Sequence, residues 1–124
     1  MRQSAVVIIG ALLMVALAAP SFATTETVTG QLIDLACFFL NQENTANAHK
    51  NKGYNCAQAC AREGFAVGIL TAGGKVYELT GDLAADKNAK LVPHMAHKVT
   101  ITGDVSEKNG QMMIVASDLR MISN

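Results

Sequence analysis

The stretch KVTITGDVSEKNGQMMIVA, residues 98–116, decides the fold of this chain. Within it, residues 98–105 alternate between apolar or small side chains and polar ones, which is the two-residue period of a half-buried strand. One face of this strand would hold Val99, Ile101, Gly103 and Val105. Asn109-Gly110 is a strong hairpin signal, because both residues tolerate the positive φ angles of a two-residue turn. We therefore predict a strand that turns back into a second strand over residues 111–116.

Working outward from this hairpin, further strands and a helix complete the pattern. The upstream strands are predicted over residues 27–35 (TVTGQLIDL, with a bend at Gly30), 65–71 and 75–80, and residues 119–122 close the chain. Gly73-Gly74 can form the tight turn between the second and third strands. A short helix is predicted within residues 83–96, with Leu83, Lys87, Leu91 and Met95 on one face and Pro93 disturbing its end.

Five strands with a helix between the third and the fourth follow the order of an OB-fold, a small Greek-key barrel. We therefore expect a mainly β protein with short helices, built as a five-stranded OB-like barrel. A helical insertion that contains cysteines, over about residues 38–64, follows the first strand.

The first 23 residues have the pattern of a secretory signal peptide. Arg2 precedes an apolar run over residues 5–19, and Ser21-Phe22-Ala23 supplies small residues for cleavage. The run is shorter than the roughly 20 apolar residues that span a bilayer, so we expect no stable membrane anchor after cleavage. Removing 23 of the 124 residues leaves a single domain over residues 24–124, in the periplasm or secreted.

Charge and composition argue against nucleic-acid binding. The chain has 10 Lys+Arg and 10 Asp+Glu, without a basic run, and it contains no Trp. A protein that binds nucleic acid needs a positive surface for the phosphates, and often aromatic side chains for stacking. We therefore expect the partner to be a metal ion or another protein.

The insertion and the strand end before it carry Cys37, His49, Cys56 and Cys60. In an exported chain, an odd number of cysteines leaves at least one thiol outside any internal disulfide. A helix predicted over residues 56–63 places Cys56 and Cys60 at i and i+4, on one face. The chemistry of this protein is therefore expected in this window.

The first interpretation of the window is a structural disulfide between Cys37 and either Cys56 or Cys60. It would close a loop of roughly 20 residues and stabilise the domain by about 3 kcal/mol in the chain-entropy account. The oxidising compartment permits it. It leaves the third thiol unexplained.

The second interpretation is a metal site with Cys37, Cys56, Cys60 and His49 as ligands. Three thiolates and an imidazole suit tetrahedral Zn(II), and thiolates also suit Cu(I). Asp34 would then stand behind the metal and accept a hydrogen bond from His49.

The third interpretation is thiol–disulfide exchange by Cys56 and Cys60, with Cys56 near a helix N-terminus, where the helix dipole lowers a thiol pKa. The Cys-x-x-Cys motif and the βαβ pattern of redox domains are missing from the sequence.

A second, weaker cluster combines His94, Met95 and His97, which are possible copper ligands. We expect Met95 to lie in the core and both histidines to face the surface. Three other methionines are expected to fill the core: Met112, Met113 and Met121. The sequence shows no catalytic constellation, and we predict a protein that is not an enzyme.

The order of these motifs resembles a group of small exported bacterial OB-fold-like proteins, most of them uncharacterised. The motifs are VTGQLIDLAC, a His-bearing linker, CAQAC, a Gly-Gly hairpin ending in VYEL, and KVTITGDV. The group's pattern is Asp-x-x-Cys, then His, then Cys-x3-Cys, which here corresponds to Asp34, Cys37, His49, Cys56 and Cys60. The resemblance implies the fold and export rather than an activity.

Three functions stay open at this point. One is an exported small binding module whose Cys/His cluster holds a structural disulfide or a Zn or Cu ion. The others are a thiol–disulfide redox protein and a purely structural domain that binds a protein partner.

Overall fold

The structure is a computed structural model that describes residues 23–43, 45 and 56–123, with only the backbone of Ser123. Of the predicted signal peptide, all but Ala23 lies outside the described residues, and His49 lies outside them too. Among the helices that are described, none has both the length and the apolar character to cross a membrane.

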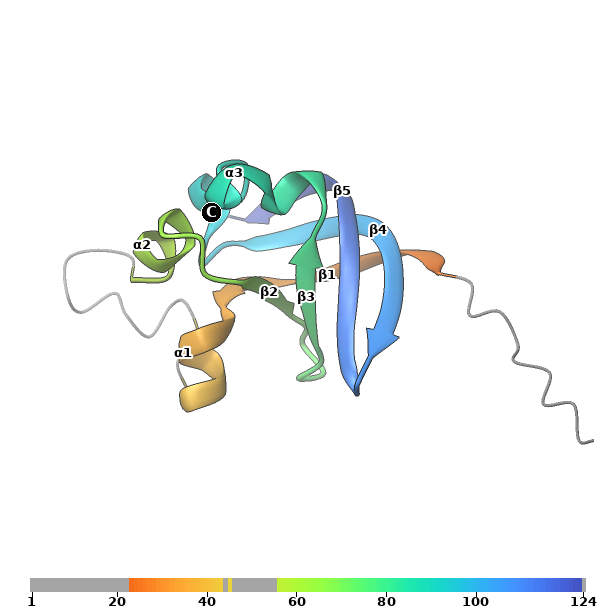
Figure 1. The fold of residues 1–124 in the computed structure, drawn as a ribbon, viewed down its shortest axis with the longest axis horizontal. Coiled ribbons are helices and arrows are strands. Elements are labelled where there is room, and N and C mark those ends of the chain that lie inside the picture. Colours follow the sequence, from red (N-terminus) through yellow and green to blue (C-terminus); the bar gives the residue numbers. More distant parts are fainter. Residues whose placement is uncertain (1–22, 44, 46–55, 124) are drawn as a thin grey trace, which may run out of the picture.

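In the described part of the chain, five strands close into one barrel in the order β1-β2-β3-β5-β4 (Figure 1). They are β1 (Thr24–Asp34), β2 (Val67–Leu70), β3 (Val76–Thr80), β4 (Lys98–Lys108) and β5 (Gln111–Ser123). Neighbouring strands pair antiparallel, except that β3 and β5 run parallel. Helical segments separate β3 from β4, so the prediction of a five-stranded OB-like barrel is confirmed.

Strand β4 shows why the sequence forms this barrel. Val99 and Ile101 are fully buried, whereas Thr100 and Thr102 on the other face are only half-buried. A Cβ at Gly103 would meet a backbone carbonyl of the neighbouring strand β5, so glycine lets the two strands approach. The predicted alternation of β4 is confirmed.

The β4–β5 hairpin turns at Asn109-Gly110, with φ angles of 52° and 77°, as predicted. Beyond the turn, two separate strands were predicted, over residues 111–116 and 119–122, and this prediction was wrong. Strand β5 continues without interruption from Gln111 to Ser123. The register shifts opposite Thr102 and Gly103, where Ser117 has no facing residue. This bulge bends the strand and lets it continue.

The first strand ends one residue earlier than predicted, and a helix that the sequence analysis did not predict follows at once. Helix α1 (Leu35–Leu40) begins after Asp34, whose side chain accepts a hydrogen bond from the Cys37 backbone N–H at 3.2 Å. This is an N-cap, which satisfies one of the helix's otherwise unpaired donors. The residues LACFFL are apolar enough to resemble a continued strand, and the helix buries Leu35 and Phe38.

The cysteine-bearing helix was predicted within one residue, since α2 covers Cys56–Arg62. The helix predicted within residues 83–96 was wrong in form. The chain there makes three short pieces: η2 (Asp82–Ala84), α3 (Ala85–Asn88) and η3 (Val92–His94). Asp86, Lys87 and Asn88 have φ angles between 52° and 60°, which is left-handed backbone. Such residues interrupt a right-handed helix.

A buried side chain explains this bent segment. Asn88 is 4% exposed, and its amide nitrogen donates to the carbonyls of Ala61 at 3.0 Å and Phe65 at 2.9 Å. Asparagine tolerates left-handed backbone better than most residues. The segment therefore bends to place Asn88 against the end of α2, while Leu91 and Met95 enter the core, as predicted for Met95.

Candidate metal centre

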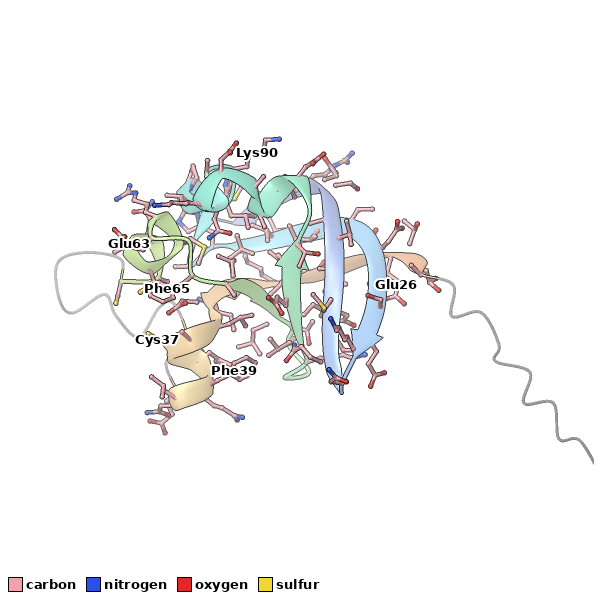
Figure 2. All side chains as sticks on the ribbon, in the orientation of Figure 1. Glu26, Cys37, Phe39, Glu63, Phe65 and Lys90 are labelled. Atoms are coloured by element: carbon pink, nitrogen blue, oxygen red, sulfur yellow. The ribbon has the colours of Figure 1, made fainter. Side chains whose placement is uncertain are left out.

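Side chains from three elements meet where β1 passes into α1. Asp34 ends β1, Cys37 lies in α1, and Cys60 comes from α2. One carboxylate oxygen of Asp34 and the Sγ atoms of Cys37 and Cys60 lie within 4.8 Å of one another. In Figure 2 Cys37 is on the side of α1 nearer α2.

Cys56 adjoins this group from the preceding turn of α2. It affects both other thiols: its charge raises the pKa of Cys37 and of Cys60, and it also hydrogen-bonds to Cys60. All three cysteines are half-buried. Asp34, Cys37 and Cys60 thus form the close group, and Cys56 adjoins it through Cys60. We name the four residues the Cys3Asp cluster: Asp34, Cys37, Cys56 and Cys60.

Helix α2 is held in place by small residues and side-chain hydrogen bonds. Ala57 and Ala61 are buried, and their size lets the helix lie close to the barrel. Gln58 donates from Nε2 to the Val92 carbonyl at 3.0 Å, and Asn88 bonds the other end of the helix. The positions of Cys56 and Cys60 are therefore set by the fold.

Asp34 is buried, with only 4% of its surface exposed. Its Oδ2 accepts the backbone N–H of Cys37, and its Oδ1 has no hydrogen-bond partner among the described residues. A buried carboxylate oxygen without a partner is unfavourable, because it loses its water without a replacement. Some donor or cation is therefore expected at this oxygen.

The cluster raises the pKa of two of its thiols. Hydrogen bonding to Asp34 is the main cause for Cys37, and burial and the charge of Asp34 add to it, against a smaller lowering by a hydrogen bond to Cys60. Burial, followed by the charges of Asp34, Cys56 and Cys37, raises the pKa of Cys60 to about 12. In each case the thiolate is disfavoured by negative neighbours, and a bound cation would reverse this effect.

Of the residues predicted for a site, the structure brings Cys37, Cys56 and Cys60 together, whereas the expected ligand His49 lies outside the described residues. No disulfide joins the three cysteines, all of which are described. Asp34 had been expected behind a histidine, and it instead lies directly beside two sulfurs. The Asp-x-x-Cys spacing could have predicted the contact between Asp34 and Cys37, because an N-cap side chain contacts the residue three positions later.

The second predicted cluster is only partly formed. His94 Nδ1 lies 2.9 Å from the Sδ of Met121, a neighbour that the sequence analysis assigned to the core. Met121 is 37% exposed, so that assignment was wrong. Met95 is 1% exposed and belongs to the core as expected, and both histidines are half-buried rather than surface-facing. Among the described residues, this His–Met contact belongs to no group of three or more neighbouring His, Cys, Asp or Glu residues.

Comparisons of the chain with protein-family models, with curated proteins and with solved structures gave no significant match. The site therefore has to be interpreted from its own chemistry.

Proposed function

We propose that this protein is a small exported module that binds one transition-metal ion through the sulfur atoms of Cys37, Cys56 and Cys60. The observation that carries the proposal is the approach of the Cys37 and Cys60 thiols, from two separate helices, to within 4.8 Å of each other and of the buried carboxylate of Asp34, with the Cys56 thiol hydrogen-bonded to Cys60. Thiolates are strong ligands for Zn(II) and Cu(I). A cation at this point would compensate four groups that otherwise repel one another when charged.

The raised pKa values of Cys37 and Cys60 argue against these two thiols as the attacking groups of thiol–disulfide exchange. The thiolate is the attacking species in exchange, and reactive cysteines have a lowered pKa. Here the pKa of Cys37 is raised, and that of Cys60 is raised to about 12. Few thiolates of Cys37 and Cys60 therefore form at neutral pH in the metal-free protein, whereas a metal ion displaces the protons as it binds.

A structural disulfide between Cys37 and Cys60 is the second candidate, because their Sγ atoms lie within 4.8 Å. A bond length of about 2.05 Å would require the two sulfur atoms to approach by up to about 2.7 Å. This candidate gives the Cys56 thiol no role and leaves Asp34 only as the N-cap of α1. The metal interpretation uses all four groups.

The test is a thiol count together with metal analysis on the same sample of mature protein, purified without reductant from the compartment to which it is exported. Metal binding predicts about one metal ion per chain and three thiols that react only after a chelator is added. Cys37→Ser and Cys60→Ser should lose the metal. His94→Ala, which alters the second cluster, is the matched control and should retain it. A metal-free protein with a Cys37–Cys60 disulfide would contradict the proposal.

A further inference from the structure

We propose that the carboxylate of Asp34 is itself the fourth ligand, so that the centre is a three-sulfur, one-oxygen site for a divalent ion of the Zn(II) class rather than for Cu(I). This inference rests on the proposed function. It adds which atoms of the same site coordinate the ion and which ion the site prefers. It replaces the sequence-based expectation that His49 completes the site and that Asp34 stands behind it.

The first argument is the state of the Asp34 carboxylate. It is 4% exposed, and its Oδ1 has no partner among the described residues, although Oδ2 accepts the Cys37 backbone N–H and the Cys37 thiol also hydrogen-bonds to this carboxylate. A carboxylate that only capped α1 would need one oxygen and could lie at the surface, as most N-cap residues do. Burial of the second oxygen beside sulfur atoms is explained if that oxygen, or the pair, binds a cation.

The second argument is distance. The carboxylate oxygen and the Sγ atoms of Cys37 and Cys60 all lie within 4.8 Å of one another. With Zn–S bonds of about 2.3 Å and tetrahedral angles, two sulfur ligands stand roughly 3.8 Å apart. These three atoms therefore need to approach by about 1 Å for zinc-like geometry, and the Cys56 thiol, which hydrogen-bonds to Cys60, is the adjoining fourth ligand.

The third argument is charge and ligand type. Three thiolates and one carboxylate carry four negative charges, of which a divalent ion neutralises two and a monovalent ion one. Cu(I) is soft and satisfied by sulfur, whereas Zn(II) accepts carboxylate oxygen as a ligand. With Cu(I), the buried Asp34 carboxylate would stay without compensation. The carboxylate thus selects for the divalent ion.

A conservative substitution separates this role from the structural one. Asn is as good an N-cap as Asp, so Asp34→Asn keeps the hydrogen bond to the Cys37 N–H and removes the charged ligand. The matched control is Glu63→Gln, which removes a carboxylate from an exposed residue just beyond α2, apart from Cys37 in Figure 2. Circular dichroism and thermal unfolding of the metal-free proteins check that each variant folds.

The experiment measures Zn(II) and Cu(I) affinity of the reduced, metal-free proteins by competition with chromophoric chelators under anaerobic conditions. We expect Asp34→Asn to weaken Zn(II) binding by about 100-fold or more, in line with the removal of groups that bind or orient around a metal. Cu(I) affinity should change by less than about 3-fold, and Glu63→Gln should change neither. Cobalt(II) substituted into the wild-type protein should show tetrahedral absorption bands that Asp34→Asn shifts or weakens.

Each result decides the matter. Unchanged Zn(II) affinity in Asp34→Asn would overturn the inference while leaving the proposed function in place. An equal loss of Zn(II) and Cu(I) affinity would overturn the selectivity. Loss of Zn(II) binding in His49→Ala, with Asp34→Asn unaffected, would return the fourth position to the histidine. A wild-type protein that binds neither ion would refute the proposed function itself.

Discussion

In the proposed site, Asp34 has two tasks that usually fall to different residues. Its Oδ2 caps α1, and its carboxylate lies beside the sulfur atoms of Cys37 and Cys60. Because the cap fixes where the helix begins, the same side chain determines the direction in which Cys37 projects. If the centre binds a metal as proposed, binding and the folding of α1 are connected through this one residue.

The raised thiol pKa values make the stability of the metal-free protein depend on pH. The pKa of Cys60 is about 12 when folded and near its ordinary value of 9.0 when unfolded. As the pH rises above about 9, the unfolded chain therefore loses this proton first, and ionisation favours unfolding. The contribution of the Cys60 thiol to the free energy of unfolding is fully present below about pH 9 and is lost as the pH approaches about 12.

We predict that the free energy of unfolding of the metal-free protein is level between about pH 7 and 8.5 and falls above about pH 9. Urea unfolding at a series of pH values measures it. Cys60→Ala supplies the control, because lysine titration in the same range affects both proteins. Identical slopes in the two proteins would show that Cys60 does not carry a raised pKa.

At the scale of elements, α2 depends on a neighbour far away in sequence. Asn88 donates two hydrogen bonds to the carbonyls of Ala61 and Phe65, at the end of the helix that carries Cys56 and Cys60. Asn88 also has a φ angle of 60°. We predict that Asn88→Gly, which tolerates this backbone, destabilises the protein by about 1–3 kcal/mol through the lost hydrogen bonds.

Asn88→Ala should cost about 1 kcal/mol more than Asn88→Gly, because alanine adds left-handed strain. Both variants should also weaken metal binding, since α2 loses an attachment. Chemical unfolding and a zinc titration measure the two effects. A stability equal to that of the wild-type protein in Asn88→Gly would contradict the role of this side chain.

The barrel makes a separate prediction at Gly103. A Cβ there would meet the Val115 backbone carbonyl on β5, so Gly103→Ala should destabilise by about 1–3 kcal/mol as an overpacked substitution does. Gly73→Ala is the matched control, since a Cβ at Gly73 meets only the Thr71 hydroxyl, at 3.9 Å. Thermal unfolding compares them, and equal midpoints would refute the packing argument.

Sequence alone could predict the elements whose pattern is local. The alternation around Val99 and the Asn109-Gly110 turn depend on neighbouring residues only, and both were confirmed. Helix α1 could not be predicted, because its apolar residues suit a strand as well as a helix. The bend at residues 86–88 depends on hydrogen bonds from Asn88 to a distant helix.

The candidate site, too, could be predicted from the sequence only in part. Cys37, Cys56 and Cys60 could be grouped from their spacing and odd number. The position of Asp34 directly beside the sulfur atoms could not be predicted, because it depends on α1 beginning immediately after this residue. Nor could the contact between His94 and Met121, which lie 27 positions apart in the chain.

At the scale of the whole molecule, metal binding should stabilise the entire domain, because the cluster joins α1 and α2 to the end of β1. A ligand at 100 times its Kd stabilises the folded state by about 2.7 kcal/mol. For a domain of this size, we predict that zinc raises Tm by at least about 10 °C. Calorimetry with and without zinc measures the shift, and an equal shift in a Cys37→Ser/Cys60→Ser double variant would show that it arises elsewhere.

The central claim is that the three thiols hold a metal ion rather than a disulfide. Native mass spectrometry of the mature protein, purified without reductant, tests it most directly, because one spectrum distinguishes a bound ion from the loss of two hydrogens. We predict the mass of the chain with one zinc ion and no disulfide. A metal-free mass that is two hydrogens lower, with one alkylatable thiol, would contradict the account.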